Sequence, residues 1–204
     1  MKNIRSLALV MAALALHSAP AFSQQILSRD EAMKYAFLVA QNEPAPSLAP
    51  IKVDADLKRP FGGYEDEYGV LVLPETKLTA ATFQSLGKDV IPVGQLWLRK
   101  LTPQVNGSAV ESSSLQLVSI THEGETVRVP LCLLGARKTD SGALELLVFG
   151  KGREPLLRLP LAKGQSSQSL PLELSGERES DGGLIKLRIV GQYVASIPVT
   201  ELPE

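Results

Sequence analysis

The chain of 204 residues contains one cysteine and two histidines, and these low numbers exclude several kinds of chemistry. A single cysteine, Cys132, can form no disulfide within the chain, so this is not a disulfide-stabilised scaffold. His17 lies within residues 1–23, which read as a signal peptide, so the mature protein keeps one histidine and one cysteine, too few for the three or four nitrogen and sulfur ligands of an ordinary zinc site. The sequence also has no Gly-x-Ser-x-Gly nucleophile motif and no phosphate-binding glycine loop between a predicted strand and a helix.

An excess of one charge and a long apolar run are lacking as well. The 21 Lys and Arg residues nearly balance the 22 Asp and Glu residues, so the basic surface typical of a nucleic-acid-binding protein is not expected. The main apolar run, Leu7 to Leu16, is ten residues long. A membrane-spanning helix needs roughly 18 or more apolar residues. We therefore expect no nucleic-acid partner and no membrane span in the mature protein.

Residues 1–23 have the pattern of a secretory signal peptide. Lys2 and Arg5 precede the apolar run, and Ala21-Phe22-Ser23 places small residues at the cleavage positions. We expect cleavage after Ser23, which makes the mature protein soluble and secreted or periplasmic.

Residues 24–50 are expected to form an N-terminal helix and a proline-rich linker. Ser28 and Glu31 have the spacing of a capping box, and the apolar residues that follow recur at helical intervals. This pattern predicts a helix over 29–41 that packs against the main body. Three prolines within residues 42–50 then predict an extended linker.

Residues 51–204 are predicted to form one domain that is mainly β. Strands are expected at 51–55, 69–73, 93–101, 115–122, 125–134, 143–149, 155–161, 170–174, 184–190 and 193–199, and a short helix at 79–86, between Thr79 and Gly87. Glycine, asparagine and aspartate in the connections are typical turn residues. The pattern favours an antiparallel β-sandwich of about 8–10 short strands, with a partly open β-barrel as the alternative.

The most distinctive local feature is an acidic and aromatic segment at 54–68, most of it a predicted loop at 59–67. Its candidate metal ligands are the carboxylates of Asp54, Asp56, Glu65, Asp66 and Glu67. These hard oxygen ligands would suit Ca²⁺ in a calcium-stabilised secreted domain, but their spacing does not match the EF-hand. Alternatively, the carboxylates could serve a glycoside hydrolase or a carbohydrate-binding module. A solvated surface loop is the third interpretation.

Three aromatic residues, Tyr64, Tyr68 and Trp97, could contact a sugar or a protein partner. Trp97 lies between Leu96 and Leu98, so the alternation leaves open whether its indole faces solvent or the core. Binding requires the acidic residues to line a concave pocket with Trp97 or the tyrosines, whereas a convex loop argues against it.

Neither His122 nor Cys132 is expected to be catalytic. His122 is at a predicted hairpin tip and reads as a solvated turn residue, while Cys132 belongs to an apolar strand and reads as a buried hydrophobe. The sequence thus predicts an exported, non-enzymatic β-sandwich that acts as a binding or structural module in the periplasm or cell envelope. Its expected partner is a protein, another envelope component or a carbohydrate. No cofactor is expected unless the calcium alternative holds.

Overall fold

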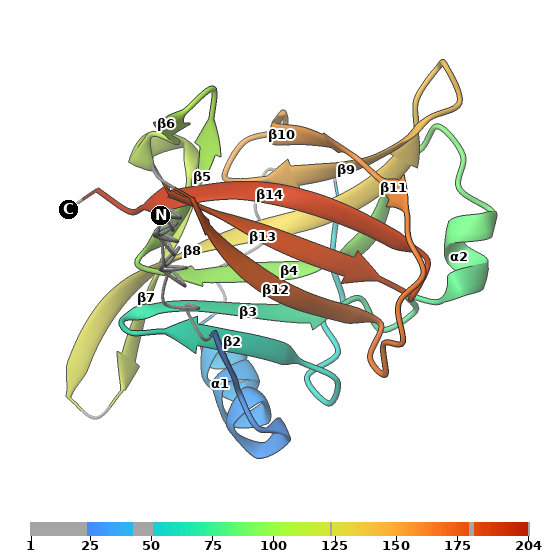
Figure 1. Ribbon diagram of the computed structural model, residues 1–204. Coiled ribbons are helices and arrows are strands. Elements are labelled where there is room, and N and C mark those ends of the chain that lie inside the picture. The colour runs from blue at the N-terminus through green and yellow to red at the C-terminus, as the bar shows by residue number, and fades with distance from the viewer. Residues whose placement is uncertain (1–23, 43–50, 123, 180–181, 204) are drawn as a thin grey trace, which may run out of the picture.

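The computed structural model describes residues 24–42, 51–122, 124–179 and 182–203. The predicted signal peptide and most of the predicted linker lie outside these ranges. Two antiparallel β-sheets pack face to face, with two α-helices at their periphery (Figure 1). Among the described residues no strand is paired in both sheets, which confirms the predicted sandwich in preference to the barrel.

The larger sheet has the strand order β1-β2-β3-β4-β8-β9-β10, with β7 paired to β8. Its strands are β1 (Gln25–Ile26), β2 (Phe61–Glu65), β3 (Tyr68–Pro74), β4 (Ile91–Arg99), β7 (Gln116–His122), β8 (Glu125–Lys138), β9 (Leu144–Phe149) and β10 (Pro155–Pro160). The smaller sheet has the order β12-β13-β14-β5-β6, with β11 paired to β14. Its strands are β5 (Leu101–Val105), β6 (Ser108–Ala109), β11 (Ala162–Lys163), β12 (Leu172–Glu179), β13 (Gly182–Ile189) and β14 (Tyr193–Glu201). The helices are α1 (Arg29–Gln41), α2 (Ala80–Gln84) and a single 3-10 turn, η1 (Ser112–Ser114).

Both faces of the larger sheet are buried. Its inner face, which includes Leu96 and Cys132, packs against Leu174 of the smaller sheet. Its outer face, which includes Trp97, packs against Ala36 of α1. Because successive residues of a strand point to opposite faces, neighbouring residues of β4 enter two separate cores. The molecule therefore has three layers: the smaller sheet, the larger sheet, and α1 on the outer face.

The N-terminal helix has the predicted limits and the predicted capping box. The backbone N–H of Glu31 donates to the hydroxyl of Ser28 at 3.4 Å, and the N–H of Ser28 donates to the Glu31 carboxylate at 2.9 Å. The Ser28 hydroxyl also donates to the Glu31 carboxylate at 2.6 Å, and this bond, together with the one from the Ser28 backbone N–H, holds the pKa of Glu31 below its usual value. The helix buries Ala32, Ala36 and Val39, so small side chains allow it to lie close to the outer face.

The predicted strand at 51–55 is not a regular strand. Only Ala55 forms a β-bridge, with Glu75. Ile51 and Val53 are nevertheless buried on the outer face, so the alternation predicted burial correctly but not strand pairing.

The predicted loop at 59–67 was wrong, because it contains β2 and the turn to β3. Gly62 and Gly63 hide this strand in the sequence, since glycine is uncommon inside strands. A Cβ at either glycine would come 2.7 Å from a side-chain atom of the N-terminal segment, so glycine at both positions lets that segment lie close to β2. The turn itself places Asp66 at a φ of 54°.

The remaining predicted elements are present, with shifted ends. Helix α2 has Thr79 as its N-cap, as predicted, but its C-cap is Ser85 and not Gly87. Strands β8 and β12 run past their predicted ends, to Lys138 and Glu179.

A buried carboxylate fixes the segment that follows the linker. Glu75 is 5% exposed, and its carboxylate accepts hydrogen bonds from the backbone N–H of Asp54 at 2.7 Å and of Lys77 at 3.3 Å.

Glu75→Ala is expected to lower the free energy of unfolding by about 2–3 kcal/mol, because it leaves these amides without an acceptor. Urea unfolding measures this change. As a control, Glu154→Ala, at a side chain that is 89% exposed, should change it by less than about 0.5 kcal/mol. Equal effects of the two variants would contradict the assigned role of Glu75.

Candidate functional site

A cleft opens on the outer face where β8 separates from β4. The two strands pair from Ile91 and Ala136 to Trp97 and Leu131. Before Leu131, β8 pairs only with β7 within the part of the chain that the structure describes. The β7–β8 hairpin therefore projects past the end of β4, while α1 lies against β2 and β3 (Figure 1). The hairpin and the helix form the two walls of the cleft.

The floor of the cleft is apolar. The cleft has a volume of about 560 Å³, and its floor is formed by Leu71, Trp97, Ile120 and Val129, none of which is more than 7% exposed. The indole N–H of Trp97 donates to the side-chain oxygen of Gln95 at 3.0 Å. The polar edge of the indole is therefore satisfied by the protein, which leaves its ring as apolar surface.

Exposed apolar side chains gather at the rim of the cleft. Five large apolar side chains of the described residues are exposed, namely Ile26, Tyr35, Phe37, Tyr64 and Val127. Tyr35, Tyr64 and Val127 line the cleft. Tyr35 belongs to α1, Tyr64 to β2 and Val127 to β8, so each wall contributes one such group. Apolar groups that gather beside polar ones on a surface are typical of a ligand groove.

Charged side chains complete the rim. Glu31, Asp66, Arg99 and Glu125 line the cleft, together with His122. Glu31 is engaged in the capping box. The side chains of Asp66, Arg99 and Glu125 make no hydrogen bond or ion pair with any described residue. Three charged groups at the cleft are thus available to a ligand.

A second, smaller cavity lies at the end of the sandwich. This mouth cavity has a volume of about 280 Å³ and lies between the β2–β3 turn and the strands β12, β13 and β14. Glu65 and Tyr68 line it, whereas Tyr64 and Asp66 line both cavities. One carboxylate oxygen of Glu65 is buried and has no hydrogen-bond partner. The β2–β3 turn therefore separates two hollows.

The candidate calcium ligands do not come together. Asp54 accepts a hydrogen bond from the Thr76 hydroxyl at 3.3 Å, Asp56 binds the Arg59 guanidinium at 2.6 Å, and Glu67 forms an ion pair with Lys100. Among the residues that the structure describes, no group of three or more His, Cys, Asp or Glu side chains could hold a metal ion.

The pKa of Asp56 reflects its role in the fold. Burial on its own raises this pKa, but the hydrogen bonds from Arg59 and from the backbone of Lys58, together with the positive charges of both residues, outweigh burial and leave the pKa below its usual value. The charged form of Asp56 is thus stabilised by its own neighbours, with no need of a metal.

The structure places Trp97, Cys132 and His122 in three different environments. Trp97 is 2% exposed, so it is a core residue that forms the floor of the cleft and not an exposed anchor. Cys132 points to the inner face, where complete burial raises its pKa to about 12. His122 is half-buried at the rim of the cleft, and so less exposed than expected for a turn residue. Since Cys132 and His122 lie on opposite sides of the larger sheet, they form no nucleophile–base pair.

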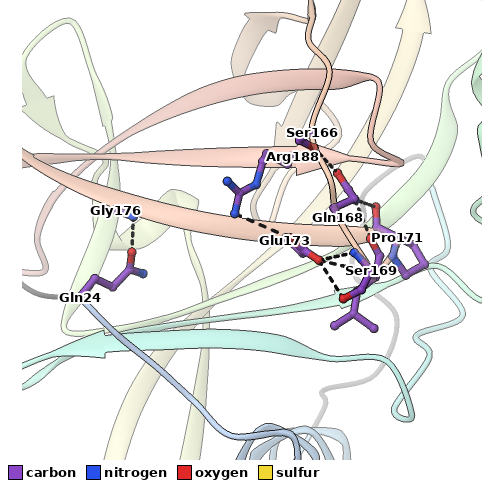
Figure 2. A network of polar contacts seen from close by, with 9 residues as sticks. Gln24, Ser166, Gln168, Ser169, Pro171, Glu173, Gly176 and Arg188 are labelled. Carbon is purple, nitrogen blue, oxygen red and sulfur yellow. Dashed lines mark hydrogen bonds and ion pairs between the residues drawn. The ribbon is translucent and has the colours of Figure 1, made fainter.

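A buried polar network on the smaller sheet is structural. The carboxylate of Glu173 in β12 accepts hydrogen bonds from the backbone N–H groups of Ser169 at 2.7 Å and Leu170 at 3.2 Å, and lies 3.7 Å from the Arg188 guanidinium. Figure 2 shows Glu173 with its partners Ser169 and Arg188. Gln168 donates to two carbonyl groups of the same loop. These contacts fix the loop before β12.

The sequence pattern found part of this site. It singled out Tyr64, Asp66 and Trp97, all of which line the cleft. It missed Tyr35 and Glu125, which lie on other elements, and Arg99, which lies on β4 two residues after Trp97. The one available signal was that Tyr35 falls outside the buried stripe of α1 and is exposed in spite of its large ring.

No helix of the described residues has the length and apolar character needed to cross a membrane. Comparisons of the chain with protein-family models, with curated proteins and with solved structures gave no match.

Proposed function

We propose that the protein is an exported, non-enzymatic binding protein that holds a small ligand in the cleft between α1 and the β7–β8 hairpin. The single observation that carries this proposal is that three of the five large apolar side chains exposed among the described residues line this cleft. Its volume of about 560 Å³ is within the range of small-molecule sites. Such sites are mostly apolar, with a few polar groups that orient the ligand.

Two further features support binding without catalysis and action outside the cytoplasm. The thiol of Cys132 lies in the inner core, away from the cleft, and its raised pKa keeps it protonated. Export rests on the sequence of residues 1–23, whose basic start, apolar run and small-residue end are those of a signal peptide.

Carbohydrate binding is a second candidate, favoured by one observation. Asp66 and Tyr64, both from the acidic and aromatic segment, line a concave site together with Trp97, as that hypothesis requires. Glu67 is turned away from both cavities and pairs with Lys100. The apolar floor and the burial of Trp97 favour a ligand with an apolar body over a sugar.

N-phenyl-1-naphthylamine, an uncharged apolar dye, tests the proposed site. Trp97 is the only tryptophan of the chain, so energy transfer from tryptophan to the dye reports binding at the cleft floor. Tyr35→Ala is expected to weaken dye binding roughly fivefold, because it removes an aromatic contact at the rim.

Phe37→Ala provides the matched control. Phe37 is also an exposed aromatic residue of α1, but it does not line the cleft, so its loss should change dye affinity less than about twofold. Absence of saturable energy transfer, or equal losses in the two variants, would contradict the proposal. Saturable binding of soluble oligosaccharides in place of the dye would favour the carbohydrate candidate.

A further inference from the structure

We propose that the ligand of the cleft is a small organic cation in which an ammonium group is joined to an apolar chain or ring. This inference rests on the proposed binding function and names the class of its ligand.

The charges of the cleft favour a cation. Three carboxylates, those of Glu31, Asp66 and Glu125, line the cleft with a single guanidinium, that of Arg99. An anionic ligand would meet one positive and three negative groups, whereas a cationic ligand is attracted by the three carboxylates and repelled only by the guanidinium. Glu65, the last residue of β2 and next to Asp66 in the chain, adds a further negative charge within the range of charge–charge attraction at low ionic strength.

Two of the carboxylates have no partner inside the protein. Other carboxylates of this region are engaged, as Glu67 is with Lys100 and Asp56 with Arg59. Asp66 and Glu125, in contrast, have no bonding partner among the described residues. They come from the β2–β3 turn and the start of β8, and both line the cleft. Two unpartnered carboxylates from different elements thus favour a ligand that carries positive charge.

Aromatic rings accompany these carboxylates. Tyr35 and Tyr64 are each 39% exposed at the rim, and the Tyr64 hydroxyl donates to the Gln25 side chain at 2.5 Å, which fixes its ring. The face of a tyrosine ring attracts an ammonium group, and such contacts recognise quaternary ammonium ligands elsewhere. Rings and carboxylates at one rim suit the charged head of the ligand.

The floor suits the other end of such a molecule. Leu71, Trp97 and Val129 form an apolar floor below the rim, and the only polar atom of the indole already donates to Gln95. Because these floor side chains are at most 7% exposed, a hydrocarbon body in the cleft covers mainly the exposed apolar area of Tyr35 and Val127 above them. The head and the body of the ligand thus have separate parts of the same cleft to occupy.

The test is competition with the dye by three compounds that share a benzene ring: benzyltrimethylammonium, its uncharged isostere neopentylbenzene, and the anion benzenesulfonate. In low salt, the cation is expected to bind roughly tenfold more tightly than the isostere, and the anion more weakly than either. The advantage of the cation should shrink in 0.5 M salt, because the rim is exposed to solvent.

Equal affinities for cation and isostere, with dye binding intact, would overturn this inference and leave the proposed function standing. Absence of dye binding would overturn both.

Two neighbouring carboxylates of the β2–β3 turn provide a matched pair of variants. Asp66→Asn removes one charge from the cleft, and asparagine tolerates the positive φ of 54° at this position. It should weaken cation binding roughly fivefold, a larger loss than for the uncharged isostere. Glu67→Gln removes the same charge one residue away, outside both cavities, and should alter neither affinity more than about twofold.

The double variant Asp66→Asn with Glu125→Gln should abolish the preference for the cation over its isostere. Retention of the full preference in the double variant, or equal losses from Asp66→Asn and Glu67→Gln, would overturn the inference. Dye affinity in each variant shows that the cleft is still formed.

Discussion

The thiol of Cys132 is expected to react with the disulfide reagent DTNB at least about 1,000-fold more slowly in the native protein than in the unfolded protein at pH 8. Complete burial raises its pKa from 9.0 to about 12. Since only the thiolate attacks, this change lowers the reactive fraction by about three orders of magnitude, before steric exclusion of the reagent is considered. The release of nitrothiobenzoate, with and without urea, measures both rates.

The same burial predicts a dependence of stability on pH. In the folded state the Cys132 thiol keeps its proton to a higher pH than in the unfolded state. The contribution of this thiol to the free energy of unfolding is therefore intact below pH 9.0 and declines as the pH rises toward about 12. Cys132→Ala should remove this component of the decline. Reaction of the native thiol within about tenfold of the unfolded rate would contradict its place in the inner core.

Gly94→Ala is expected to lower the free energy of unfolding by about 3 kcal/mol or more. A Cβ at Gly94 would come 2.4 Å from the backbone carbonyl oxygen of Leu73 and 2.8 Å from a methyl group of Leu172. The contact with Leu73 cannot be relieved by a side-chain rotation, because it involves the backbone of β3. Both faces of β3 are buried, one in each of the two cores, so movement of this strand disturbs both cores.

Gly87→Ala is the matched control for this variant. No atom lies within 4 Å of a Cβ at Gly87, and its backbone is outside the region that only glycine adopts readily. Its stability should change by less than about 1 kcal/mol, with alanine favoured through lower entropy of the unfolded chain. Urea unfolding of both variants makes the comparison, and similar losses in both would contradict the close packing of β3 on β4.

The sequence predicted the sandwich because local patterns determine most of its strands. Alternation and turn residues located the main strands of both sheets, and the Ser28–Glu31 pair located the start of α1. The alternation failed to orient Trp97, since β4 is buried on both faces and therefore has no polar phase that marks the solvent side. It failed at β2, where Gly62 and Gly63 serve a close approach that only the tertiary structure reveals.

The site was harder to predict than the fold, for a physical reason. The cleft exists because β8 separates from β4 after a shared stretch of pairing, and the extent of pairing between distant strands is not a local property. The acidic turn could be recognised by composition, which identified Asp66. Its companions Tyr35 and Glu125 could not, because they come from a helix and a hairpin that only the completed fold brings to the same cleft.

The central claim is that the cleft between α1 and the β7–β8 hairpin is the binding site, and two-dimensional ¹H–¹⁵N NMR tests it most directly. The spectrum contains one indole N–H signal, because Trp97 is the only tryptophan. On titration with N-phenyl-1-naphthylamine, this signal should shift together with the amide signals of Tyr35 and Val127, while those of β12 and β13 stay in place. Shifts confined to the smaller sheet, with the Trp97 indole unchanged, would contradict the claim.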